Sequence, residues 1–96
     1  MSGETGSGGA AARLDAGLED ARRELAAGRP AEAESLLLAL LERHPEAAAA
    51  WDELGRARNN LRRLPEAEAA FREALRLDDR LAPAWNHLGH VLRATG

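Results

Sequence analysis

Side chains that could carry out catalysis or hold a metal ion are few in this sequence. His87 and His90 are three residues apart, so on a helix they would share one face, but two histidines make a weak metal site and their helix offers no carboxylate or thiolate. Of the five hydroxyl residues, only Ser35 lies away from the ends, and no histidine stands near it in the sequence. Asp52 and Glu53 are adjacent, so they point to different faces of a helix and form no acid–base dyad. We therefore predict no enzyme activity, no metal site and no cofactor.

The composition disfavours several classes of partner. The 96 residues carry a formal net charge of −3 and a pI of about 5.6, whereas nucleic acids and anionic membranes attract basic proteins. Cysteine is absent, which removes disulfides and thiolate ligands. No apolar run approaches the roughly 20 residues that span a bilayer, and residues 1–9 lack the charged and apolar regions of a signal peptide. We expect a soluble, cytoplasmic protein that binds neither nucleic acid nor membrane.

The chain must place these side chains on helices, because apolar residues recur at helical spacing and no stretch alternates with a period of two. Residues 1–9 are rich in glycine, and we expect them to form a flexible tail. Glycine and proline then divide the remainder, since glycine commonly follows a helix and proline commonly opens one. The predicted helices cover residues 10–27, 30–43, 47–60, 65–77 and 83–96.

The sequence also repeats itself. Trp51 and Trp85 are 34 residues apart, and residues 50–55 (AWDELG) align with residues 84–89 (AWNHLG). In this pattern the chain resembles the tetratricopeptide repeat family, whose 34-residue units carry W-x-x-L-G in the first helix and alanine with a large apolar residue in the second. Residues 48–81 match best, with Trp51, Leu54, Gly55, Ala67, Phe71 and Ala74 at the family's spacing.

The resemblance implies an all-α fold of antiparallel helix-turn-helix repeats, stacked as a short right-handed α-solenoid of five helices in about two and a half units. The domain covers residues 10–96, with an atypical first repeat at 14–47, a second at 48–81 and the first helix of a third at 82–96. In the first repeat, Gly17, Asp20 and Ala21 stand where Trp, Leu and Gly belong. Gly55 and Gly89 lack a β-carbon, so paired helices are expected to approach closely there.

In this family the first helices of successive repeats line a concave groove that holds a partner. Carried over by helical position, the groove residues are Arg22, Asp52, Glu53, Arg56, Asn59, Asn60, Asn86, His87, His90 and Arg93. Some members clamp a C-terminal carboxylate with Lys, Asn and Arg, and this chain lacks that set. A ligand whose basic residues engage Asp52 and Glu53 is an equally strong hypothesis.

The resemblance thus implies a protein–protein interaction module that binds a peptide or protein partner. The alternative is a non-catalytic arm of a larger enzyme, such as a sulfotransferase, glycosyltransferase or hydroxylase, whose catalytic domain lies outside this chain. Leu88, Val91 and Leu92 would ordinarily meet a partner helix, so we expect the natural polypeptide to continue past Gly96, unless the fifth helix is itself the cap. A third hypothesis is self-association through this exposed last helix.

Overall fold

The computed structural model describes residues 7–96, and within this range it contains helices and no strand. The five helices are α1 (Ser7–Ala26), α2 (Pro30–Arg43), α3 (Ala48–Asn60), α4 (Leu64–Leu77) and α5 (Ala82–Thr95). The predicted all-α fold of five helices is therefore confirmed. Proline stands in the first turn of α2, α4 and α5, where its missing N–H costs no hydrogen bond.

The first helix begins earlier than the sequence pattern indicated. It starts at Ser7, so the last three residues of the predicted tail lie in α1, while residues 1–6 lie outside the described residues. Ala10–Ala12 are strong helix formers, and the helix continues from them toward the N-terminus through Gly9. The other predicted boundaries agree with the structure to within one residue.

Two turns between helices use a left-handed residue. Gly28, after α1, has a φ of 78°, and Arg62, which is 34 residues later, has a φ of 65°. At both turns the next backbone N–H bonds back into the helix: Arg29 to the carbonyl of Glu24 at 2.8 Å, and Arg63 to the carbonyl of Arg58 at 2.9 Å. The same C-cap thus occurs twice, once with glycine and once with a residue that is strained there.

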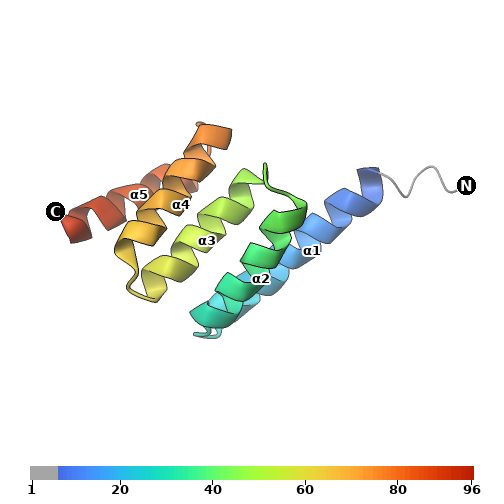
Figure 1. Cartoon of the computed structure of the whole chain (residues 1–96), viewed down its shortest axis with the longest axis horizontal. Coiled ribbons are helices and arrows are strands. Elements are labelled where there is room, and N and C mark those ends of the chain that lie inside the picture. The colour runs from blue at the N-terminus through green and yellow to red at the C-terminus, as the bar shows by residue number, and fades with distance from the viewer. Residues whose placement is uncertain (1–6) are drawn as a thin grey trace, which may run out of the picture.

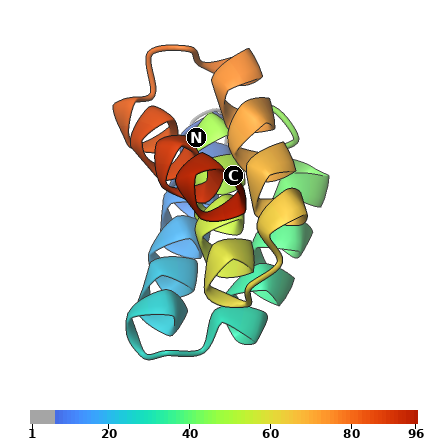
Figure 2. The same cartoon turned by 90° about the vertical axis from the view of Figure 1, so that its left-hand side faces the viewer.

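The helices form a row, with α1 and α5 at opposite ends of its long axis (Figure 1). Along the row, α2 and α4 lie on one side and α1 and α5 on the other (Figure 2). The central helix α3 contacts all four of the others. In the same view α3 lies between the two pairs (Figure 2), in contact with α1 and α5 as well as with α2 and α4.

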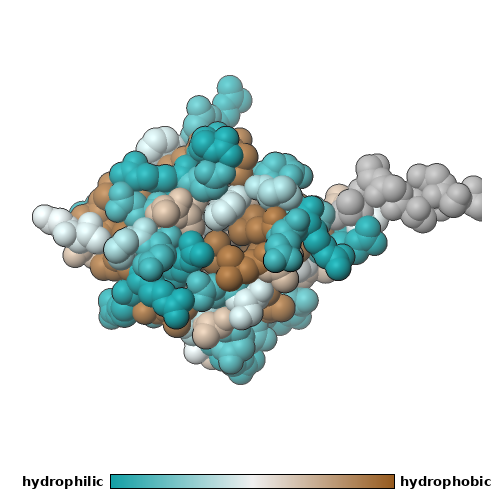
Figure 3. All heavy atoms as spheres, in the orientation of Figure 1, coloured by the Kyte–Doolittle hydropathy of each residue, from teal (hydrophilic) through white to brown (hydrophobic). Residues whose placement is uncertain are grey.

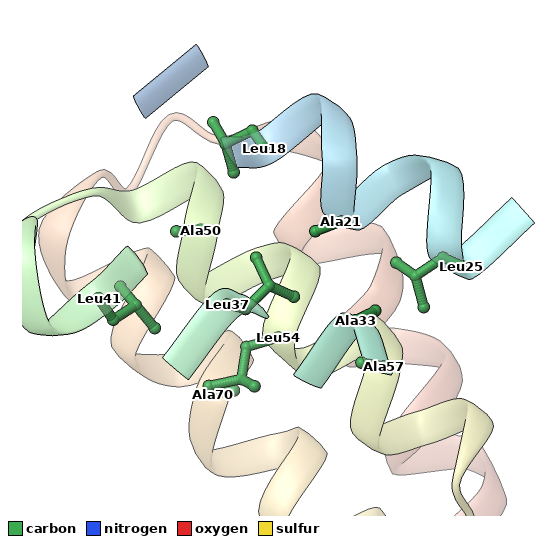
Figure 4. Packing of buried hydrophobic residues seen from close by; sticks show 10 residues of the cluster. All are labelled: Leu18, Ala21, Leu25, Ala33, Leu37, Leu41, Ala50, Leu54, Ala57 and Ala70. Carbon is green, nitrogen blue, oxygen red and sulfur yellow. The ribbon is translucent and has the colours of Figure 1, made fainter. Parts of the chain in front are cut away.

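The buried apolar residues fall into two clusters that the 34-residue shift relates. In the first cluster Leu37 of α2 points between Ala21 of α1 and Leu54 of α3 (Figure 4), and all three are fully buried. In the second cluster Phe71 of α4 packs with Leu88 of α5. Phe71 and Leu88 are the repeat equivalents of Leu37 and Leu54, so each unit buries the same helical faces.

The two glycines of the W-x-x-L-G pattern differ in their surroundings. A β-carbon at Gly55 would lie 2.4 Å from Phe71 Cε1, so the predicted close approach of two helices is confirmed there. At Gly89 nothing lies within 4 Å of the same position, so the prediction is wrong for that residue. The reason is that α4 covers Gly55, whereas no described helix covers Gly89.

The last helix is also less exposed than the sequence suggested. Leu88 and Val91 are 4% and 1% exposed and pack in the second cluster beside α4, so they already have a partner helix. Only Leu92 of the three apolar residues remains exposed, at 40%.

On the face shown in Figure 3, apolar patches lie between hydrophilic side chains. On α2, Leu36 and Leu38 are each a little over 40% exposed. None of the helices in the described part of the chain is long and apolar enough to cross a membrane.

Candidate functional site

The predicted groove residues lie on α1, α3 and α5, the first helices of the three units. A hollow of about 100 Å³ opens between α3 and α5, and five of the predicted residues line it together with Phe71. These five are Arg56, Asn59, Asn60, His87 and His90. The structure therefore brings residues from two successive repeats together around one hollow.

Glu53 is the centre of the charged part of this site. Its carboxylate accepts hydrogen bonds from Arg22 Nε at 2.7 Å and from Arg56 Nη1 at 2.9 Å, one to each oxygen. Glu53 is 5% exposed, whereas the side chains of Arg22 and Arg56 are 49% and 42% exposed. One buried carboxylate thus fixes two guanidinium groups from neighbouring repeats while most of their N–H donors still face solvent.

Asp52 is paired as well, with a residue of the next repeat. Its Oδ1 lies 3.0 Å from His87 Nδ1, and because an ionised carboxylate can only accept, Nδ1 of His87 donates. Burial raises the pKa of Asp52 above its ordinary value of 3.8, and the bond to His87 opposes that shift. The His87 ring also packs on Phe71 with 5.4 Å between ring centroids. In neutral His87 this arrangement leaves Nε2 as a hydrogen-bond acceptor.

The remaining predicted residues extend the site along α5. Arg93 Nη2 lies 3.0 Å from His90 Nδ1, and because arginine has only donors, Nδ1 of a neutral His90 accepts. His90, Arg93 and Asn86 are all exposed. Asn86 and Arg93 do not line the hollow between α3 and α5, so they lie at the edge of the site.

The hypothesis of a basic ligand that engages Asp52 and Glu53 is not supported by this geometry. Both carboxylates are 5% exposed, and both already bond to side chains of the protein. A cationic ligand would have to displace Arg22, Arg56 or His87 and enter a buried position. The accessible charged groups next to these two acids are consequently the guanidinium donors of Arg22 and Arg56, which favour the opposite ligand charge.

Two features of the site were missed by reasoning from the sequence. The ring of Phe71 lines the hollow although it belongs to α4, and Asp52 pairs with His87 across two repeats. The pairing of Asp52 with His87 could have been predicted from their spacing. They are 35 residues apart, which is one repeat plus one residue, and so lie on adjoining first helices. The Asp52–His87 pair also places a carboxylate beside a histidine whose own helix has none.

A wider hollow of about 360 Å³ lies at the other end of the row, between α1 and α2. Its lining is largely apolar, with Gly17, Leu36 and Leu40 among the residues that form it, and it contains none of the predicted groove residues. Within residues 7–96, no three side chains of His, Cys, Asp or Glu are placed to hold a metal ion together. Of these two hollows, only the one between α3 and α5 is therefore lined by predicted groove residues.

Comparison with known proteins agrees with the architecture. The family model described as tetratricopeptide repeat matches residues 18–82, which is more than half of the chain. No curated protein matches the sequence. Members of this family generally serve as protein–protein interaction modules. The match covers every residue of the first core cluster and the α4 residues of the second, and the chain belongs to the tetratricopeptide repeat family.

Proposed function

We propose that this protein is a non-catalytic interaction module that binds an extended segment of a partner protein along α1, α3 and α5. The observation that carries the proposal is the arrangement around Glu53, where one buried carboxylate holds Arg22 and Arg56 at 2.7 Å and 2.9 Å. Preorganised side chains lose little freedom when a ligand arrives, so more of the contact energy appears as affinity.

The chemistry of the exposed groups supports a partner segment that carries acidic side chains. Arginine presents five N–H donors, and Glu53 accepts only one from each of its two partners in this site. The free donors suit carboxylates and backbone carbonyls. Asn59 and Asn60 add side-chain amides, which can both donate to and accept from an extended backbone.

The hollow between α3 and α5 supplies the apolar part of the proposed site. Phe71 forms part of its lining, and a volume of about 100 Å³ suits a small side chain. We therefore propose an extended acidic segment with a small apolar residue at the level of Phe71. Cytoplasmic location is part of this proposal, and fractionation of cells that express the tagged protein tests it.

In the alternative, where the chain is a non-catalytic arm of a larger enzyme, this groove would also bind a protein segment. In that case the docked segment belongs to the enzyme's substrate or partner, and the chemistry lies in another domain. The experiment below applies to both versions.

The test is selection of binders from a library of random peptides displayed at equal abundance. We expect enrichment of Asp and Glu in the selected peptides, and loss of their capture by the double variant Arg56→Gln, Asn60→Ala. The matched control is Arg72→Gln on α4, which removes an exposed arginine paired with Glu68 at 3.0 Å, away from the groove. Enrichment of Lys and Arg, or capture that the double variant leaves unchanged, would refute the proposal.

A further inference from the structure

One face of α5 is apolar and has no helix of the described residues packed on it. Trp85, Gly89 and Leu92 follow one another at spacings of four and three residues, so they form a single stripe along the helix. Trp85 is 55% exposed and Leu92 is 40% exposed, which makes them two of the few large apolar side chains on the described surface. Large apolar side chains gathered on one exposed face commonly mark an interaction site.

This stripe is distinct from the other two faces of α5. Ala84, Leu88 and Val91 are buried against the second core cluster. His90 and Arg93 belong to the groove side of the helix. The stripe therefore lies between the core face and the groove face, and a partner could occupy it without displacing a groove ligand.

The repeat shows what this face looks like when it is covered. Shifting by 34 residues places α5 on α3, Trp85 on Trp51 and Gly89 on Gly55. Trp51 is partly buried against both core clusters, and Phe71 of α4 lies over Gly55 at 2.4 Å from the position of a β-carbon. On α5 the same position is open, with no atom within 4 Å.

The tryptophan of the open face is held in the same way as that of the covered face. Nε1 of Trp51 donates to the carbonyl of Pro45 at 2.9 Å, and Nε1 of Trp85 donates to the carbonyl of Asp79 at 2.8 Å. Each acceptor lies six residues before its tryptophan. Trp85 is thus fixed by a hydrogen bond before any partner arrives, which lowers the cost of docking.

The covering helix of the middle unit defines the chemistry that fits. On α4 the side that faces the core carries Phe71 with Ala67 four residues before it and Ala74 three residues after it, all at most 1% exposed. The first unit gives the contrast: there Ala21 occupies the place of Gly55, and the smaller Leu37 occupies the place of Phe71. In the middle unit, a glycine on the first helix leaves room for an aromatic residue of the second. We therefore expect an aromatic side chain to pack over Gly89.

We propose that the stripe of Trp85, Gly89 and Leu92 is a second docking site, which takes an amphipathic helix with an aromatic residue over Gly89 and alanines four residues before and three residues after it. The docking repeats at α5 the packing that α4 makes on α3. It goes beyond the groove function, because the occupant is a helix rather than an extended segment and it lies on a different face.

The test uses a synthetic peptide of residues 61–81, which contains α4 and its two flanking turns, added to the whole protein. The protein has two tryptophans, so a nitrogen–proton correlation spectrum contains two indole signals, which Trp85→Phe assigns. We expect the Trp85 signal to shift on titration and the Trp51 signal to remain in place. A peptide with Phe71→Ala should bind at least about tenfold more weakly, since the ring is the main buried group.

The matched protein variant is Gly89→Ala. Its new methyl group meets no atom in the free protein, and alanine is the better helix former, so the variant should be at least as heat-stable as the parent. It should nevertheless weaken peptide binding by at least about tenfold, because the methyl group would collide with the docked aromatic ring.

Three results would overturn the proposal. They are no shift of the Trp85 signal up to the solubility limit of the peptide, binding that Gly89→Ala leaves unchanged, and binding that the Phe71→Ala peptide retains in full. Sedimentation of the protein alone tests the expected self-association: a dimer that Gly89→Ala abolishes, together with failure of the peptide to bind, would assign the face to a second copy instead.

Discussion

The substitution Gly55→Ala tests whether the glycine is required by the aromatic ring that lies over it. Alanine is the better helix former by about 1 kcal/mol, and this gain alone would stabilise the protein. The added β-carbon, however, would lie 2.4 Å from Phe71 Cε1 and 2.6 Å from Cδ1, so ring or backbone must move. Overpacking of this kind costs roughly 1–3 kcal/mol, and we expect a net loss of about 1 kcal/mol.

Gly89→Ala is the matched control, because it makes the same chemical change at the repeat-equivalent position. Its β-carbon meets no atom within 4 Å, so only the helical gain of about 1 kcal/mol should appear. The two variants are therefore expected to differ by about 2 kcal/mol, with opposite signs relative to the parent protein.

A second substitution should reverse the damage. Phe71→Leu with Gly55→Ala recreates the pair that the first unit uses, Ala21 with Leu37. Phe71→Leu alone should cost roughly 1–2 kcal/mol through lost burial. In the double variant the new methyl group has room, so Gly55→Ala should then bring the helical gain of about 1 kcal/mol, and the coupling energy should reach about 2 kcal/mol.

Urea denaturation of the four proteins of this cycle, followed by circular dichroism, provides the free energies, and unchanged slopes show that the comparison is valid. Two outcomes would refute the reasoning. One is a Gly55→Ala protein as stable as Gly89→Ala, which would mean that Phe71 moves aside freely. The other is simple additivity in the cycle, which would mean that the two residues do not constrain each other.

Four further substitutions test the two left-handed turns and the buried acids. Arg62→Gly should raise the free energy of unfolding by about 0.5–1 kcal/mol, because glycine adopts the φ of 65° without a β-carbon clash; Gly28→Ala should lower it by about 1 kcal/mol, and urea denaturation that shows the same sign for both would contradict this. Asp52→Asn should flatten the pH dependence of stability at pH values above the ordinary pKa of 3.8, as urea denaturation across pH measures: burial raises the pKa of Asp52, so the folded state keeps a proton that the unfolded chain releases, and stability contributed by that proton is lost as pH rises. Glu53→Gln should cost about 1–2 kcal/mol by urea denaturation, since two arginines lose their shared anion; a gain would show that desolvation of Glu53 outweighs both ion pairs.

The helices and their order could be predicted from the sequence because the residues that begin and end each helix act locally. Proline in a first helical turn and glycine after a helix act through their own φ preferences, so their effect does not depend on distant residues. The turn at Arg62 lacks that signal. Its left-handed conformation is imposed by the hydrogen bond from Arg63 to the carbonyl of Arg58 and by the packing of α3 on α4. Nothing about an arginine predicts such a conformation.

The sequence predicts which helix face carries each residue of the site, but not which side chains pair with each other. Helical periodicity places Asp52, Glu53 and Arg56 on or beside the groove side of α3, whatever stands opposite. Whether a carboxylate there is free or buried depends on what α1 and α5 bring against it. In this protein they bring Arg22 and His87, so both acids are used internally and the charged side chains exposed next to Glu53 are arginines. A count of charges along α3 alone cannot give that sign.

The departures of the first unit from the family pattern also depend on which side chains face each other across its two helices. Gly17 stands where the middle unit has Trp51, and Leu40 stands where it has Ala74. A β-carbon at Gly17 would lie 2.7 Å from Leu40 Cδ1, so the leucine has taken the space that a tryptophan would need. In the first unit the large side chain therefore belongs to the second helix, whereas in the middle unit it belongs to the first. A unit of this protein thus depends on the total volume that the facing side chains of its two helices fill. The absence of a family residue from one helix therefore has to be judged together with the residue that faces it on the other helix.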